Sequence, residues 1–332
     1  MSRADVAAAI LWIGATLYAL FGGADFGAGL WDLIAGDAET GERPRALIQR
    51  SLTPVWEANH VWLIFILVVL WTAFPEVFGA IMSTLYVPIA LAAVGIVLRG
   101  AGFAFRKSVR RLEYRRAMGA AFALSSVLTP FFMGTVVGAI AAGNVPAGGN
   151  GDAFSSWLAP LPLLTGALFV ASGAYLAAVY LLADAHRADD EPMESYFSRR
   201  AMAAGVLAGV VALFGLIALH GEARYVYDRL IVEGLPLVIV SILCGFGVLA
   251  MLLGRQRRGL RPLAAGAVIA VIWGWGVAQF PYLLPTSLKI SQAAAPGPTL
   301  DAVLIVFIIA ALVVLPALGL LYWLSQRQLL DE

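Results

Sequence analysis

The sequence predicts an all-α polytopic membrane protein, and its composition is the first reason. Of the 332 residues, 61% are hydrophobic and 13% are charged, and the mean hydropathy is +0.86. Soluble domains average about 45–50% apolar and about 25% charged residues, so an ordinary soluble enzyme and a disordered chain are both excluded. The net charge of +1 also excludes a nucleic-acid-binding protein.

The second reason is the length of the apolar runs, which suits membrane helices. A bilayer core of about 30 Å needs about 20 apolar residues in a helix, and the runs lack the alternation of barrel strands. The gaps between them are too short for a globular domain, so we expect a single integral membrane domain over 1–332. Nine runs are long enough, and they lie near 6–35, 53–73, 77–98, 118–142, 160–183, 201–219, 234–253, 263–284 and 300–324.

The third reason is the distribution of basic residues, which also predicts the topology. Lys and Arg are retained on the cytoplasmic side of a membrane. With nine spans, 18 of the 22 basic residues fall on one side, and the others are Arg3, Arg224, Arg229 and Lys289. The N-terminus is therefore expected outside and the C-terminus in the cytoplasm.

The largest group of basic residues lies in the predicted loop 99–117, which starts at Arg99. A cluster of this kind binds anionic lipid headgroups or a partner subunit, or it serves only to anchor the topology. The sequence leaves both interpretations open.

Asp25 is an ionisable residue inside the first run, where a charge is costly and normally faces the interior of a bundle. Gly22 and Gly29 stand at i−3 and i+4 on the same helical face, and small residues let another helix come close. The carboxyl is therefore expected against a neighbouring helix. There it either carries protons or is a structural group satisfied by backbone donors.

Two further ionisable residues, Glu57 and His60, lie near the cytoplasmic start of the second run. They stand at i and i+3 and therefore share a helical face, with Asn59 beside them as a hydrogen-bonding group. Their predicted depth overlaps that of Asp25. The three groups together predict a short proton relay from the cytoplasm.

Metal and haem sites were tested against the same residues. Glu57 and His60 have the Glu-x-x-His spacing of di-iron proteins, but that site needs a second such motif, which the sequence lacks. Cys244 is the only cysteine, so a multi-cysteine site is excluded. The histidines His60, His186 and His220 fall at different predicted depths and cannot share one haem. We therefore expect no metal ligand and no haem ligand in this chain.

Five stretches of the sequence are distinctive: Gly23–Gly29, Pro54–Ile64, Ala73–Pro75, Leu98–Arg106 and Phe280–Ser287. In their order and spacing they resemble subunit II of the cytochrome bd-type quinol oxidase. The block Trp56-Glu-Ala-Asn-His-Val-Trp is the most specific of them, and the resemblance extends from end to end of the chain.

The resemblance implies nine transmembrane helices in two four-helix bundles plus a peripheral helix, the first bundle in about 1–142 and the other helices in about 160–324. It implies a partner, subunit I, which carries haems b and d and the quinol site. The complex is expected in the bacterial cytoplasmic (inner) membrane among its lipids. It oxidises quinol, reduces O₂ to water and builds a proton gradient without pumping. The resemblance leaves open whether a structural quinone is bound and whether a small single-helix accessory subunit is present.

The resemblance also implies roles for individual residues. Asp25 and Glu57 match the acids of the family's proton route, and His60 lies beside them. Trp62 matches an aromatic residue near the O₂ access path and a subunit contact. Arg99 matches an arginine at the end of the third helix, where we expect a structural or partner contact.

Three positions depart from the family pattern. Glu57 stands where relatives have Asp, His60 where Gln is common, and Ala104 where some relatives have an acid of the same proton route. Asp25 is therefore expected to carry more of the proton flux in this chain.

Two other functions fit these residues. A proton-coupled secondary transporter would use Asp25 and Glu57 as coupling acids, although the C-terminal half lacks the second copy of the Gly-rich Asp motif that paired repeats would give. A scaffold that covers the lipid face of a haem subunit would need no proton role. Co-purification with haem absorbance separates the oxidase subunit from the transporter.

Overall fold

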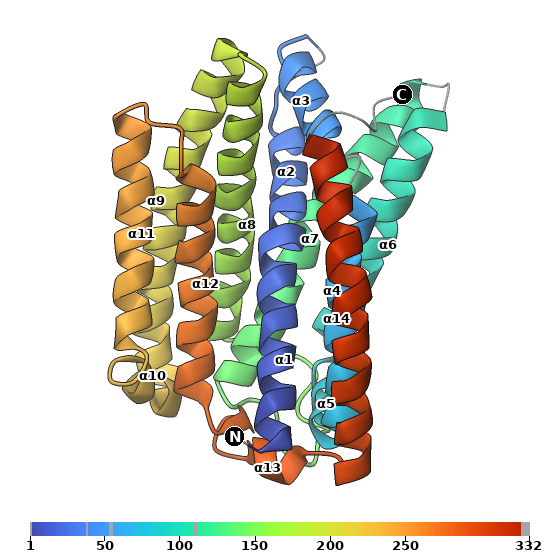
Figure 1. Ribbon diagram of the computed structural model, residues 1–332, viewed down its shortest axis with the longest axis vertical. Helices are drawn as coiled ribbons and strands as arrows, with labels where there is room; N and C mark the ends of the chain where they lie inside the picture. The colour runs from blue at the N-terminus through green and yellow to red at the C-terminus, as the bar shows by residue number, and fades with distance from the viewer. Residues whose placement is uncertain (1, 38, 53–55, 109–111, 327–332) are drawn as a thin grey trace.

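The structure is a computed structural model that describes all residues except 1, 38, 53–55, 109–111 and 327–332. It is almost entirely helical, and its long helices stand side by side along one axis (Figure 1). Within the described residues, seven helical units are long and apolar enough to cross a membrane. They are Arg3–Leu33, Met118–Ala141, Pro160–Arg187, Glu191–Glu222, Leu235–Leu253, Leu260–Gln279 and Gly297–Leu321.

The first unit consists of α1 (Arg3–Leu17), η1 (Tyr18–Gly22) and α2 (Gly23–Leu33), which follow one another without a break. A capping box starts α1, because the Ser2 hydroxyl accepts from the Asp5 N–H and the Asp5 carboxylate accepts from the Ser2 N–H. The segment η1 is a single π-helical turn, a widened turn that occurs mostly inside α-helices and often at functional sites.

A tight loop joins α2 to α3 (Glu42–Leu52). The backbone N–H and hydroxyl of Thr40 both donate to Asp37 Oδ1 at 2.8 Å, and these donors lower the pKa of the Asp37 carboxyl. The Arg45 guanidinium in α3 donates to the backbone carbonyls of Gly36 and Asp37, at 2.6 and 2.8 Å. These bonds fix α3 against the end of α2.

The next segment differs from the sequence prediction. α4 (Trp56–Ala73) and α5 (Pro75–Thr84) meet at a bend of 117°, and α6 (Tyr86–Ser108) begins only after Leu85. Pro75 occupies the first turn of α5, where its missing N–H is harmless, but its ring cannot continue α4. The predicted run 77–98 covers parts of both α5 and α6, and the structure divides it at Leu85, a break that hydropathy alone does not reveal.

The predicted loop 99–117 is also wrong in large part. α6 continues to Ser108, and α7 (Leu112–Ala141) begins directly after the residues outside the description. Arg99 therefore lies inside α6, where it is 1% exposed, and it does not belong to a basic surface loop. The physical reason is a buried ionic partner, which the sequence pattern did not indicate.

The second half of the chain is an up-and-down series of helices (Figure 1). α8 (Pro160–Arg187), α9 (Glu191–Glu222), α11 (Leu235–Leu253) and α12 (Leu260–Gln279) follow one another, with the short α10 (Arg224–Leu230) between α9 and α11.

A small cap precedes the last helix. Strands β1 (Tyr282–Leu284) and β2 (Leu288–Lys289) pair antiparallel and lead into α13 (Ile290–Ala293). α14 (Gly297–Gln326) then runs back along the molecule beside α1 and α4 (Figure 1).

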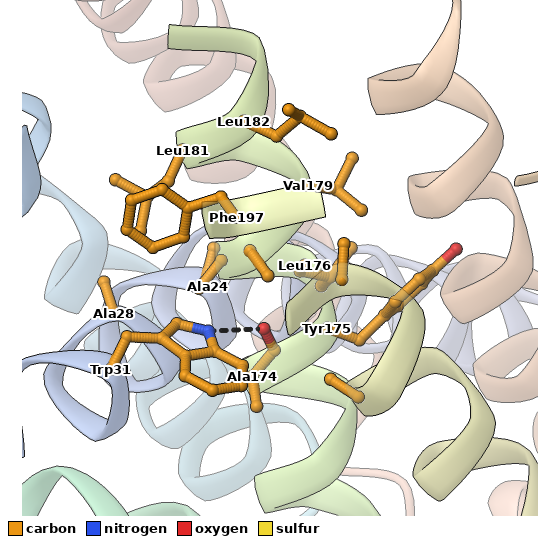
Figure 2. Packing of buried hydrophobic residues seen from close by; sticks show 14 of the residues in the cluster. Ala24, Ala28, Trp31, Ala174, Tyr175, Leu176, Val179, Leu181, Leu182 and Phe197 are labelled. Carbon is orange, nitrogen blue, oxygen red and sulfur yellow. Dashed lines mark hydrogen bonds between the residues drawn. The ribbon is translucent and has the colours of Figure 1, made fainter. Parts of the chain in front are cut away.

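The two halves of the chain are joined where α2 packs against α8. A Cβ on Gly27 would overlap the backbone carbonyl of Gly173, so the two backbones touch. The Trp31 indole N–H donates to the Ala174 carbonyl at 2.9 Å, and Phe197 of α9 packs nearby (Figure 2). This contact is apolar apart from the single indole bond.

Ion pairs tie the helix ends together on the side of the molecule where α3 lies. They connect α3 with the α8–α9 turn, α8 with α12, and α9 with the residues before α12. The pairs are Arg43–Asp190 at 3.0 Å, Arg261–Asp184 at 2.8 Å and Arg257–Glu194 at 3.3 Å.

Candidate functional site

The site is built around Asp25, which lies in the first turn of α2 and is 1% exposed. Arg99 of α6, equally buried, places Nη2 2.8 Å from Asp25 Oδ1. The same Nη2 donates to the backbone carbonyl of Asp25 at 3.0 Å, and Nη1 donates to the Ser126 hydroxyl in α7. Arg99 therefore holds both the side chain and the backbone of residue 25.

Two aromatic rings lie near the Arg99 guanidinium. Its Cζ lies 4.9 Å from the ring centroid of Phe26 and 4.5 Å from that of Phe122, which is cation–π geometry. Ser126 in turn donates to the Phe122 carbonyl at 2.6 Å. Arg99 therefore has partners in addition to the Asp25 carboxylate.

A glycine makes room for this arrangement. A Cβ on Gly29 would overlap Ser126 Oγ and would lie 2.8 Å from Arg99 Nη1. The sequence prediction that Gly29 lets another helix approach the Asp25 face is therefore confirmed. Gly22 was predicted to do the same, but a Cβ there would meet the Tyr18 ring of its own helical unit.

Burying this ion pair costs free energy, and removing one of its partners costs stability as well. Two charges taken out of water lose several kcal/mol of hydration each, and removal of one partner from such a pair typically costs about 3–5 kcal/mol. Because Arg99 has a carbonyl, a hydroxyl and two rings as further partners, it can stay charged when Asp25 binds a proton. Asp25 is thus the member of the pair that can change its proton.

α4 brings His60 to the same place. The His60 ring lies edge-on to Phe26, with 6.1 Å between centroids, and the imidazole interacts electrostatically with Asp25. Asn59, 3% exposed, donates from Nδ2 to the Phe21 carbonyl at 3.4 Å. Phe21 belongs to η1, where a π-turn interrupts the regular backbone ladder. The amide of Asn59 therefore joins α4 to the turn that precedes Asp25.

Glu57 lies one helical turn before His60 in α4, but its side chain is outside the described residues, as is that of Ala104. The structure brings Asp25, Arg99 and His60 together. The predicted contact of Glu57 with this group stays a prediction.

Trp62 is 9% exposed and lies one turn from Asn59 on the buried side of α4. Its ring is edge-on to Phe65 at 6.5 Å. The exposed side of the same helix carries other large apolar residues: Val61, Ile64, Leu67, Val68 and Trp71. The O₂ access path and the subunit contact suggested for Trp62 stay predictions.

The sequence reasoning missed two features of the site. It placed Arg99 in a loop, and it did not single out three of the buried polar residues of α7: Ser125, Ser126 and Thr129. Their spacing within an apolar run could have indicated a buried polar face. Thr129 follows Ser126 by three residues and Ser125 by four, and both spacings put the two residues on one helical face.

Within the described residues, no group of three or more His, Cys, Asp or Glu could hold a metal ion. His186 contacts Glu194, and His220 contacts Arg224. These two histidines lie at opposite ends of the antiparallel helices α8 and α9, so they cannot face one another as axial ligands.

Fold and site define a multi-pass membrane protein that buries a carboxylate–guanidinium pair inside its helix bundle. The profile of the family described as cytochrome bd terminal oxidase subunit II matches residues 4–325. The chain therefore belongs to the cytochrome bd terminal oxidase subunit II family, as its sequence motifs indicated.

Individual relatives agree with this assignment. The chain is 24% identical over 312 residues to the cytochrome bd ubiquinol oxidase subunit 2 of Bacillus subtilis (strain 168), which covers 93% of this chain and 89% of that relative. It is 28% identical over 121 residues to the cytochrome bd-I ubiquinol oxidase subunit 2 of Escherichia coli (strain K12), covering 36% of this chain and 31% of that protein.

A solved structure supports the same conclusion. A chain in the structure of bd oxidase from Geobacillus thermodenitrificans superposes with a TM-score of 0.82 at 27% identity, and the match covers 98% of both chains. The protein is thus a multi-pass membrane subunit of a quinol oxidase complex, which implies a subunit I partner. A proton-coupled transporter is not favoured.

Proposed function

We propose that this chain supports the haem-bearing subunit I of a cytochrome bd-type oxidase and supplies part of its cytoplasmic proton route. Haems b and d and the quinol site belong to subunit I in this proposal, and the complex oxidises quinol and reduces O₂ to water. The proposal rests on the buried Asp25–Arg99 pair, which lies in a chain that matches the family over nearly its whole length.

The proton route that we propose runs through Glu57, His60 and Asp25. Asp25 and His60 lie close enough to interact electrostatically, and Asp25 can exchange its proton while Arg99 keeps its other partners. A buried carboxyl that faces the interior of a helix bundle suits a relay, because intramembrane acids in that position mark proton pathways. Arg99 has the positioning role, since it fixes the carboxyl and the backbone of residue 25.

We propose nine membrane spans: the seven apolar helical units, the bent pair α4–α5, and α6. Arg43 of α3, Arg187 at the end of α8 and Arg257 before α12 lie on one side of the molecule, which supports a cytoplasmic placement of that side. The N-terminus is then outside, in the bacterial cytoplasmic membrane. In this arrangement, protons consumed at the haem site are drawn from the cytoplasm, so the complex is electrogenic without a pump.

Asp25→Asn tests the proton role, because the amide has the shape of the carboxyl but cannot carry its proton. We expect quinol-driven O₂ uptake by the purified complex to fall about 10²-fold, the lower end of what a proton-transfer group contributes, with an unchanged haem difference spectrum. The matched control is Asp301→Asn, which removes a half-exposed carboxyl paired with Arg3. Normal uptake in both Asp25→Asn and Glu57→Gln would favour the scaffold function.

A further inference from the structure

Asp32 is a second buried carboxyl on the helix of Asp25, and the proposed route leaves it without a role. It is 5% exposed. Seven residues separate it from Asp25 within α2, which corresponds to two turns and about 10.5 Å of rise. The two carboxyls therefore share one face of the helix.

The surroundings of Asp32 connect it to water. Arg45 of α3 places Nε 3.5 Å from Asp32 Oδ1, and the Arg45 side chain is 22% exposed. The same guanidinium donates to the carbonyls of Gly36 and Asp37, two exposed residues of the α2–α3 loop. Asp32 thus lies behind a partly exposed arginine.

Between the two carboxyls the α2 face is polar. Gly29 lies midway, at i+4 from Asp25, and the space where its side chain would be is filled by Ser126 Oγ and Arg99 Nη1. Ser126 is 1% exposed. Buried polar groups of α6 and α7 therefore lie against this face at Gly29, between Asp32 and Asp25.

The charged groups around this polar row come from four helices. Arg45 faces it from α3, Arg99 from α6 and His60 from α4, while Arg200 of α9 lies on the Trp31 side, 5.8 Å from that ring. The opposite face of α2 offers no comparable path, because Ala24, Ala28 and Trp31 pack there in the apolar contact with α8 (Figure 2).

We propose that Asp32 is a second proton donor to Asp25, on the side of the α2–α3 loop and in addition to the entry through Glu57 and His60. The inference rests on the proposed function, in which Asp25 relays protons. The Asp32 carboxylate takes one proton from a hydronium ion of the bulk solvent at the loop, which leaves a water molecule. Asp32 releases that proton to a water beside Ser126, which passes one on to the Asp25 carboxylate. Asp32 then returns as a carboxylate to its ion pair with Arg45, so one proton has moved and no other group has changed.

Three variants of the whole complex separate this role from a structural ion pair. Asp32→Asn removes the proton carrier, Asp32→Glu keeps it, and Arg45→Gln breaks the ion pair but leaves the carboxyl. We expect O₂ uptake with excess quinol to fall about tenfold in Asp32→Asn, which is less than the usual contribution of a proton-transfer group. In Asp32→Glu and Arg45→Gln we expect the uptake to stay within about twofold of the unchanged protein. Haem content, read from the redox difference spectrum, normalises each rate.

Equal losses in Asp32→Asn and Arg45→Gln would overturn the inference in favour of a structural ion pair. A normal rate in Asp32→Asn beside a slow Asp25→Asn would overturn it too and would leave the proposed function intact. Normal rates in both Asn variants would remove the proposed function as well.

If Asp32→Asn fails to assemble with haem, Ser126→Ala tests the same row, because it removes a hydroxyl midway without changing charge. A threefold or greater fall in rate supports the row, and an unchanged rate overturns it.

Discussion

Two faces of α2 each carry a glycine, and the two glycines make room for different kinds of neighbour. Toward α8, Gly27 lets two backbones touch, and the contact is closed by apolar side chains and one indole hydrogen bond. Toward α6 and α7, Gly29 leaves space for the Ser126 hydroxyl and the Arg99 guanidinium. Two glycines only two residues apart therefore admit a backbone on one side and a charge on the other.

This difference separates position from chemistry. The face toward α8 consists of Ala24, Gly27, Ala28 and Trp31. None of these side chains is ionisable, so this face can only determine the position of α2. The other face carries the carboxyls, and their distance from Arg99 and Arg45 depends on that position. We therefore expect changes on the α8 face to alter stability, and changes on the polar face to alter stability and turnover.

The largest expected effect comes from breaking the ion pair on one side. Arg99→Met leaves the Asp25 carboxylate buried without its guanidinium, so we expect about 3–5 kcal/mol of lost stability. The double variant Asp25→Leu with Arg99→Met removes both charges and should recover most of that loss, because a buried pair replaced by apolar residues is often neutral. Thermal unfolding of the complex, followed by haem absorbance, measures both.

The O₂ uptake of these variants then distinguishes a structural role of the Asp25–Arg99 pair from a proton-transfer role of Asp25. The double variant should stay inactive although it is stable, since it has no carboxyl at position 25. Recovery of O₂ uptake together with stability would show that the pair has only a structural role.

The next largest effect is expected on the apolar face. Gly27→Ala forces a methyl group against the Gly173 carbonyl, and overpacking of this kind costs about 1–3 kcal/mol. Gly23→Ala is the matched control four residues earlier, because a Cβ there meets no described atom within 4 Å. The control should be neutral or slightly stabilising, as Ala is a better helix former than Gly. Equal melting temperatures in the two variants would contradict the tight α2–α8 contact.

The sequence predicted the helical class, the buried Asp25 and the close approach at Gly29, because each follows from composition or from helical spacing. It could not predict that Arg99 is buried, since an arginine behind an apolar run normally marks a loop. The stabilising groups, Ser126 and the Phe26 and Phe122 rings, come from segments distant in sequence. Only their packing decides whether a charge at the end of a run stays inside the helix.

The same reasoning explains the error in the predicted run 77–98. The run is mostly apolar, and hydropathy does not show that α5 ends at Thr84 and that α6 begins at Tyr86. The direction of the chain after Phe74 depends on what packs beneath it, here the buried side of α5 against the α13 cap. A local sequence pattern carries no information about that contact.

The smallest expected effect tests the single polar contact on the apolar face. Trp31→Phe keeps an aromatic ring but removes the indole N–H that donates to the Ala174 carbonyl, so we expect about 1 kcal/mol of lost stability. Turnover should be unchanged after normalisation to haem, because no carboxyl has moved from its partner. A slowed rate in Trp31→Phe with an unchanged melting temperature would contradict the division of α2 into a positioning face and a proton-handling face.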